Sequence, residues 1–262
     1  MDGARLRFRI NLFLALALSV NVAFWFGAHE TFAQWGNVPP VPTKNGARAM
    51  MLGDEQFSYR FGAMTLQNLG NSGGRVTAIK DYDYKKLGQW FWLLNDLDPA
   101  SNHVPMMAAY YFGATQKPED VAVVVEYLAA IGQNPVGNKW RWLVHAIFLA
   151  RHRIDNLPLA LDMAYALSRM QPVGDELPAW ARQMPAFVLA EQGEKQAARK
   201  IFEEILMTAT ALHPNEVNFM KSYLVDELDV PEAEVNQIIN MRGKDLMRDA
   251  SETGVTMPAP TF

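Results

Sequence analysis

Hydrophobic residues follow two different patterns along this chain. Residues 10–28 form one continuous run without a charged side chain. From Ala47 onward, apolar residues instead recur at intervals of three and four, which is the period of an amphipathic helix. Segments rich in Gly and Pro interrupt this second pattern at residues 70–74, 116–120, 133–138 and 171–178. The pattern predicts an all-α protein, in which one transmembrane helix precedes an antiparallel array of paired helices.

The continuous run has the length of a membrane-spanning helix. At about 1.5 Å per residue it extends over about 28 Å, close to the thickness of the hydrocarbon core of a bilayer. Arg5, Arg7 and Arg9 precede the run, and the next basic residue is Lys44. The positive-inside rule therefore predicts that residues 1–9 are cytoplasmic and that the rest of the chain is exported. We expect a single-pass protein of the inner (cytoplasmic) membrane with a periplasmic C-terminal domain.

A cleaved signal peptide is the alternative interpretation of this run. Thr31–Phe32–Ala33 has the small-x-small pattern of a cleavage site, although the run is longer than an ordinary signal sequence. The following segment contains three prolines in "NVPPVP". Proline favours extended, polyproline-like backbone, so residues 29–46 are predicted to form a spacer between the membrane and the folded domain.

Four prolines recur at similar spacing in the helical part: Pro99, Pro135, Pro172 and Pro214. Eight residues before them stand Phe91, Tyr127, Ala164 and Leu206, and five residues before them stand Leu94, Ala130, Leu167 and Ala209. A separation of three residues keeps each such pair on one helical face. The recurrence predicts a repeated helix–turn–helix unit whose second helix ends at a proline, although a non-repeating helical bundle is the alternative.

This unit resembles the tetratricopeptide repeat, whose period is 34 residues. The best match is Pro185–Leu206, and weaker matches occupy residues 119–135 and 155–172. The matched positions in these three segments are Ala186, Leu189, Gly193, Ala198, Phe202 and Ile205; Val123, Tyr127, Ala130 and Pro135; and Ala160, Ala164, Leu167 and Pro172. The tryptophan expected early in each unit is displaced or absent, and the last unit carries extra residues. The resemblance, which covers roughly residues 81–214, implies an α-solenoid that binds other proteins through its concave side, without catalysis.

The helical domain is predicted to extend over residues 47–249. Residues 229–249 are expected to form a closing helix with Val235, Ile238, Ile239 and Leu246 facing inward. A flexible tail is predicted for residues 250–262. Arg75–Ile79 is the only short candidate for a strand.

Composition and motifs exclude several classes of chemistry. The chain has no cysteine, which rules out disulfides, thiolate metal sites and cysteine nucleophiles. Its net charge of −4 argues against a nucleic-acid-binding protein. No metalloprotease, nucleophile-elbow, P-loop or dinucleotide-binding motif is present. We therefore expect no catalytic residue, no cofactor, no metal and no small-molecule substrate.

Candidate binding residues concentrate in the helix predicted over residues 138–155. Its inward stripe is expected to be Leu143, Ala146, Ile147, Ala150 and Ile154. The residues flanking the stripe, which are the candidates for contact with an acidic or polar segment of a partner, are Trp140, Arg141, His145 and His152. The alternative is that the tryptophans pack between repeats and the arginines pair with nearby acids. The other aromatic cluster, Trp90, Phe91, Trp92, Tyr110, Tyr111 and Phe112, is interpreted as core.

The features together predict a membrane-anchored helical-repeat scaffold. Its expected role is protein–protein interaction in the assembly or stabilisation of a bacterial-type envelope complex. The alternative is a periplasmic enzyme with a cleaved signal peptide, namely a carboxylate-dependent hydrolase on a helical fold. That enzyme would need converging Asp, Glu or His side chains, which the sequence does not place together.

Overall fold

The computed structural model describes residues 3–28, 38–70, 76–174, 177–209 and 212–253. All regular structure in these ranges is helical, which confirms the all-α prediction. The candidate strand at Arg75–Ile79 does not form in its described part, residues 76–79. Residues 76–78 have no regular structure, and a 3-10 helix, η2, forms at Ile79–Asp81. No neighbouring strand is available within the described ranges to accept the hydrogen bonds of this short segment.

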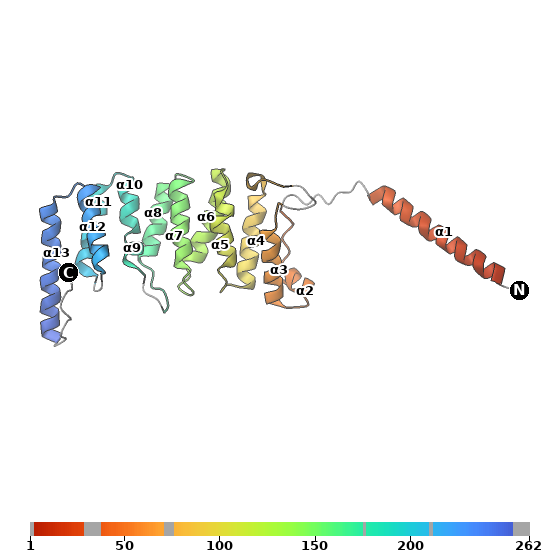
Figure 1. Cartoon of the computed structure of the whole chain (residues 1–262), viewed down its shortest axis with the longest axis horizontal. Coiled ribbons are helices and arrows are strands. Elements are labelled where there is room, and N and C mark those ends of the chain that lie inside the picture. The colour runs from red at the N-terminus through yellow and green to blue at the C-terminus, as the bar shows by residue number, and fades with distance from the viewer. Residues whose placement is uncertain (1–2, 29–37, 71–75, 175–176, 210–211, 254–262) are drawn as a thin grey trace.

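Helix α1 (Gly3–Ala28) lies apart from the rest of the protein (Figure 1). Its Arg7–Gly27 segment is long and apolar enough to cross a membrane, and its side chains are not buried by the protein. Two polar side chains bond within the helix, since Ser19 Oγ donates to Ala15 O at 2.8 Å and Asn21 Nδ2 donates to Ala17 O at 3.0 Å. Such internal bonds satisfy polar groups that lipid would leave without a partner.

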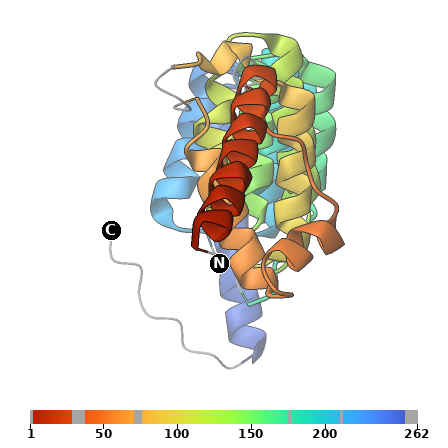
Figure 2. The same ribbon diagram turned by 90° about the vertical axis from the view of Figure 1, so that its right-hand side faces the viewer.

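The other helices stand side by side in chain order (Figure 1), and Figure 2 looks along this array. Their bounds are α2 Lys44–Met50, α3 Glu55–Gln67, α4 Tyr84–Leu97, α5 His103–Tyr110, α6 Pro118–Gly132, α7 Trp140–His152, α8 Leu157–Ser168, α9 Ala179–Arg182, α10 Met184–Glu191, α11 Lys195–Thr208, α12 Pro214–Asp226 and α13 Glu232–Thr253, with a 3-10 helix η3 at Phe112–Ala114.

The array is built from helix pairs. Helices α3, α5, α7, α10 and α12 are the first helices, and each packs against the second helix that follows it: α4, α6, α8, α11 and α13. Neighbouring pairs are joined by contacts such as α6 with α7 and α8 with α10. One hydrophobic cluster runs from Val38 to Val188, and a second runs from Ala186 to Ile238. Leu161 and Phe187 pack against both clusters, so the core is continuous along the array.

The recurring prolines mark the helix pairs as predicted, with one difference. Pro99, Pro135 and Pro172 each follow the end of a second helix. Pro214 is instead the first residue of α12, where His213 and Glu216 form a capping box. Proline suits this first position because its missing N–H would have no partner there.

Six of the eight residues that recur before the prolines are fully buried. Phe91, Tyr127, Ala164 and Leu206 are fully buried, and so are Leu94 and Leu167. Ala130 is exposed, because α6 directs Leu128 and Ile131 inward instead. Ala209 lies just beyond α11 and is partly buried.

The predicted spacer is partly folded onto the array. Residues 29–37 lie outside the described residues, but Val38 is fully buried. Trp90 Nε1 donates to Pro39 O at 3.0 Å, and Lys44 Nζ donates to Asp96 O at 2.7 Å. These side chains of α4 and α2 therefore hold residues 38–44 against the array, ahead of the start predicted for the helical domain at Ala47.

The closing helix is confirmed as α13, and it continues to Thr253. Val235 and Ile238 are buried and Ile239 is partly buried, as predicted. The side chain of Leu246 and residues 254–262 lie outside the described part of the chain.

Candidate partner-binding surface

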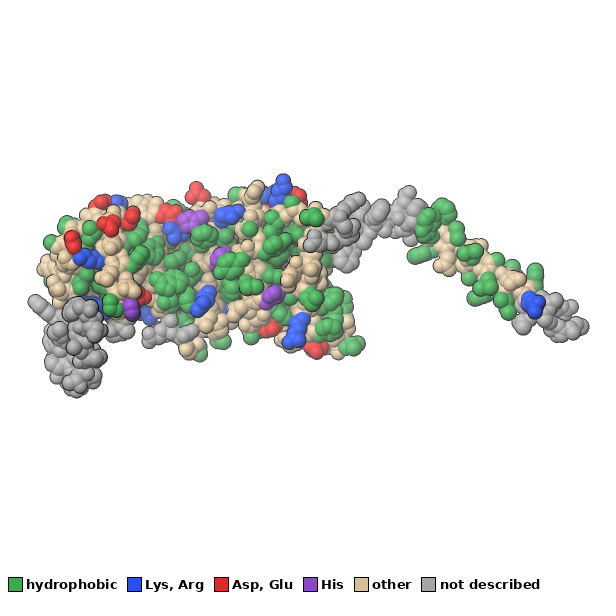
Figure 3. All heavy atoms as spheres, in the orientation of Figure 1, with side chains coloured by type: hydrophobic (Ala, Val, Ile, Leu, Met, Phe, Trp, Pro, Cys, Tyr) green, Lys and Arg blue, Asp and Glu red, His purple; other side chains and the backbone are tan. Residues whose placement is uncertain are grey.

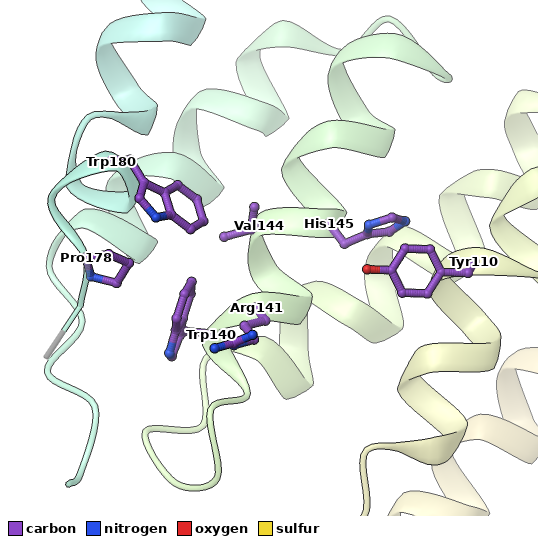
Figure 4. A pocket seen from close by; sticks show the side chains of 7 residues that line it. All are labelled: Tyr110, Trp140, Arg141, Val144, His145, Pro178 and Trp180. Atoms are coloured by element: carbon purple, nitrogen blue, oxygen red, sulfur yellow. The ribbon is translucent and has the colours of Figure 1, made fainter. Parts of the chain in front are cut away.

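A pocket of about 450 Å³ opens where α5, α7 and α9 meet (Figure 4). Helix α7 supplies four of its side chains, and the neighbouring elements supply three. The lining residues are Tyr110, Trp140, Arg141, Val144, His145, Pro178 and Trp180. Pockets of about 300–1,000 Å³ with aromatic walls and a few polar groups are typical ligand sites.

A buried lysine fixes the start of α7. Lys139 is 2% exposed, and its Nζ donates to Ser101 O at 2.5 Å. Ser101 Oγ in turn accepts a hydrogen bond from Tyr59 of α3 at 2.6 Å. Burial lowers the pKa of Lys139, and the charge of Asp98 opposes that shift. These contacts connect α3, the turn after α4 and α7, so the backbone that carries Trp140 and Arg141 has a defined position.

Trp140 and Trp180 form one wall of the pocket. Their ring centroids are 5.7 Å apart with an interplanar angle of 58°. Trp140 is 6% exposed and Trp180 is 42% exposed. Trp140, predicted to contact a partner, is therefore mostly a buried support, because α9 covers its ring. Its Nε1 is buried without a hydrogen-bond partner among the described residues. Trp180 is the tryptophan that the pocket exposes.

Arg141 lies at the edge of the pocket and is exposed. Its Cζ is 5.2 Å from the centroid of the Trp140 ring, a cation–π contact of about 0.5–1 kcal/mol at an exposed site. No acidic side chain pairs with it in the described ranges. The alternative interpretation of the sequence, in which arginines of this helix pair with nearby acids, is therefore not observed for Arg141. Its guanidinium donors are therefore not engaged by a carboxylate of the described residues.

His145 is half-buried beside Tyr110. The two rings are 4.7 Å apart between centroids, and Nε2 lies 3.1 Å from Ala109 O. Burial lowers the pKa of His145, and the hydrogen bond to the carbonyl of Ala109 opposes that shift. The neutral imidazole, with Nε2–H donating to Ala109, is thus the favoured form near neutral pH.

His152 is exposed and does not line the pocket. Phe148 links it to the pocket, because its ring centroid is 5.9 Å from that of His145 and 4.9 Å from that of His152. Helical spacing places Leu149 between the two histidines, but Leu149 is buried. It packs toward the backbone of Gly113, and this rotation of α7 turns Phe148 outward. The predicted inward stripe itself is confirmed: four of its members are fully buried and Ile154 is partly buried.

The sequence does not identify two aromatic residues that line the pocket, Tyr110 and Trp180. Tyr110 is assigned to the core but is 67% exposed, and Tyr111 and Trp92, assigned to the core with it, are also exposed. The assignment is correct for Trp90, Phe91 and Phe112. The spacing of apolar residues in α5 could have predicted the exposure of Tyr110. Val104, Met107 and Ala108 lie on the buried face of the helix, and residue 110 lies on the opposite side. The exposure of Trp180 could not be predicted in this way, because α9 is a single turn and is too short to show a helical period.

Charge is segregated between the two kinds of helix around the pocket. Helices α5, α7 and α9 contain no Asp or Glu, and they carry Arg and His instead. Helices α6 and α8 contain acidic residues and no Lys, Arg or His. The Arg151 guanidinium is paired with Glu191 of α10 at 2.6 Å. Figure 3 shows hydrophobic side chains with interspersed basic and histidine side chains across the middle of the array.

This arrangement is suited to binding. Aromatic walls can stack on an apolar group, and Arg141 can donate to a carboxylate. No carboxylate lines the pocket. The described residues also contain no group of three or more His, Asp or Glu able to hold a metal ion. Comparisons with family models, characterised proteins and solved structures found no match to this chain.

Proposed function

We propose that this protein is a membrane-anchored scaffold whose helix-pair array binds an acidic segment of a partner protein. The observation that carries the proposal is the aromatic pocket on α5, α7 and α9, three helices without an acidic residue, of which α7 and α9 carry arginines. Tryptophan, tyrosine and arginine are the residues most enriched at the energetic centres of protein interfaces. The role is assembly or stabilisation of an envelope complex.

The repeat architecture supports this function. Ala186, Leu189, Ala198 and Phe202 are buried at the places that the tetratricopeptide-repeat pattern requires. Gly193, in the turn of that unit, has φ +84°, a backbone conformation that favours glycine. Proteins built from stacked helix pairs present extended surfaces to partners. We therefore propose that the array is tetratricopeptide-like and that its first helices form the binding face.

The pocket defines the chemistry of the partner. A large apolar side chain, aromatic or proline, fits between Tyr110 and Trp180. A neighbouring carboxylate of the same segment is then within reach of the Arg141 guanidinium. The histidine-bearing row along α7 extends the surface through Phe148 to His152. A segment that alternates acidic and large apolar residues satisfies both requirements.

Loss of the Arg141 and His152 side chains from α7 should weaken capture of the partner. We expect the double variant Arg141→Ala with His152→Ala to recover about ten-fold less partner, because charge-assisted hydrogen bonds are lost. The measurement is quantitative identification of proteins co-purified with the full chain from detergent-solubilised membranes.

The matched control is Lys85→Ala with Lys200→Ala, which removes two exposed cations from second helices. It should recover as much partner as the parent. Both variants should have unchanged helicity by circular dichroism. Full recovery with the α7 variant would remove this helix from the binding site, whereas loss of helicity would show that the two side chains are structural.

The proposed orientation rests on the three arginines in the first turns of α1, which precede its uncharged run. A C-terminal fusion to a reporter that works only in the cytoplasm is expected to be silent, because the array is exported. An active reporter would contradict this orientation. Isolation of a mature chain that begins at Gln34 would contradict the uncleaved anchor.

A further inference from the structure

The two ends of the array have different surfaces. At the C-terminal end, the side chains of α13 described up to residue 242 expose Glu232, Glu234, Gln237 and Asn240, with Met241 as the one large apolar side chain exposed among them. At the N-terminal end, α2 and α3 expose five large apolar side chains. They are Met50, Leu52, Phe57, Phe61 and Met64, each more than half exposed. Because the end of a repeat array ordinarily needs a polar outer face, the N-terminal end requires a cover.

These five residues, here called the α2–α3 patch, lie together. Met50, Met51 and Phe61 line one small apolar hollow between α2 and α3. Phe57 and Met64 lie four residues before and three residues after Phe61, on the same side of α3. Leu52 stands in the turn that joins the two helices. Figure 3 shows hydrophobic side chains gathered at the lower right-hand end of the array.

The stability of the fold does not explain why a leucine occupies position 52. Its side chain is 99% exposed, and its backbone has φ +55°. The left-handed region is unfavourable for leucine and is better tolerated by Asn or Gly. A leucine at this position therefore neither fills the core nor favours the turn.

Charged side chains of both signs surround the patch. Arg60 is exposed on α3 and has no acidic partner in the described part of the chain, and Arg48 is paired with Glu55 at 3.4 Å. Asp54 is exposed two residues after Leu52, and its side chain accepts a hydrogen bond from Phe57 N at the start of α3. Basic side chains beside exposed Leu, Phe and Met are typical of segments that lie in the headgroup region.

Chain connectivity brings the patch to a membrane. If α1 spans the bilayer, residues 29–37 are the only connection from Ala28 to the buried Val38. Ten residue steps extend over at most about 35 Å, so the N-terminal end of the array stays near the surface from which α1 emerges. A short tether of this kind gives a high effective concentration, so a weak surface contact becomes populated.

We propose that the α2–α3 patch docks onto the lipid surface beside α1, with the Leu52 turn inserted in the headgroup region. The proposal rests on the membrane anchor of the proposed function. It fixes how the array stands on the membrane and leaves the binding face on α5, α7 and α9 free for a partner.

The absence of cysteine allows a site-specific test in the full chain. Gln56→Cys places a fluorophore at an exposed site on α3 without removing a member of the patch. The labelled protein is reconstituted into nanodiscs of phosphatidylethanolamine and phosphatidylglycerol that contain a lipid-borne quencher. We expect strong quenching at residue 56 and none at a label on Val173→Cys, an exposed site in the turn after α8.

The deciding variant is Leu52→Asn with Phe57→Gln, which should abolish quenching at residue 56 while the melting temperature stays unchanged or rises. The control, Val136→Asn with Val173→Asn, removes two exposed apolar side chains elsewhere and should leave quenching intact. Quenching that persists in the deciding variant would overturn the proposal. So would absent quenching of the label at residue 56 in the protein with an intact patch.

Alkaline carbonate extraction of membranes tests the membrane anchor separately from the docking of the α2–α3 patch. A protein that resists extraction but shows no quenching at residue 56 retains its anchor and lacks the docking contact. A protein released by carbonate has no anchor, and the docking proposal falls with it.

Discussion

Replacing Gly132 with alanine is expected to lower the free energy of unfolding by about 2 kcal/mol. The substitution adds one methyl group at the end of α6, where helix propensity alone predicts a gain of about 1 kcal/mol. The gain is outweighed because a Cβ at this position would lie 2.4 Å from Leu143 N and 2.8 Å from Leu143 Cα. Those atoms are backbone of α7, so the clash is relieved only if the two helices separate.

The effect should appear as a fall in melting temperature of about 4–8 °C, measured by far-ultraviolet circular dichroism on the full chain in detergent. Ala130→Leu is the matched control, because Ala130 is exposed on the same helix. It should change the free energy of unfolding by no more than about 0.5 kcal/mol. A Gly132→Ala protein as stable as the parent would contradict the close packing of α6 against α7.

Replacing Ala198 with tryptophan is expected to have a larger effect, with a loss of about 3 kcal/mol or more. Ala198 is fully buried in α11, in the same cluster as Ala186 of α10 and Phe202. An indole ring does not fit between α10 and α11 without displacing one of them. In an array whose units contact only their neighbours, the damage should stay local.

Hydrogen exchange measures both the loss of stability and its restriction to the neighbouring helix pairs. Amides in residues 184–242 should lose protection, while those in α4 and α6 retain it. Lys200→Trp, at an exposed position of α11, should leave the exchange pattern unchanged. Uniform loss of protection along the chain would contradict the local character of the array, and unchanged protection would contradict the predicted register.

The helices that line the pocket differ in charge from the second helices beside them. The acids of α6 and α8 contribute to the net charge of −4, whereas α7 and α9 carry arginines and no acid. A negatively charged protein can therefore still attract an acidic segment at one surface, because exposed charges act mainly within a screening length of about 8–10 Å.

Several features of this protein are determined by the sequence alone. The uncharged run of residues 10–28 predicts α1, and the three- and four-residue spacing predicts helices throughout the domain. The prolines at 99, 135 and 172 follow the ends of second helices. These predictions succeed because each depends on the order of residues within one helix or at its ends.

The tertiary structure alone decides which residues form the two candidate surfaces. Tyr110 and Trp180 are distant in sequence, yet both line the pocket beside Arg141 and His145. The apolar end of the array likewise appears only once α2 is packed on α3. Helical periodicity defines which side chains share a face, but it does not define how far each helix is rotated about its axis or which neighbour covers it. Close packing between helices settles that rotation, as the burial of Leu149 and the exposure of Phe148 show.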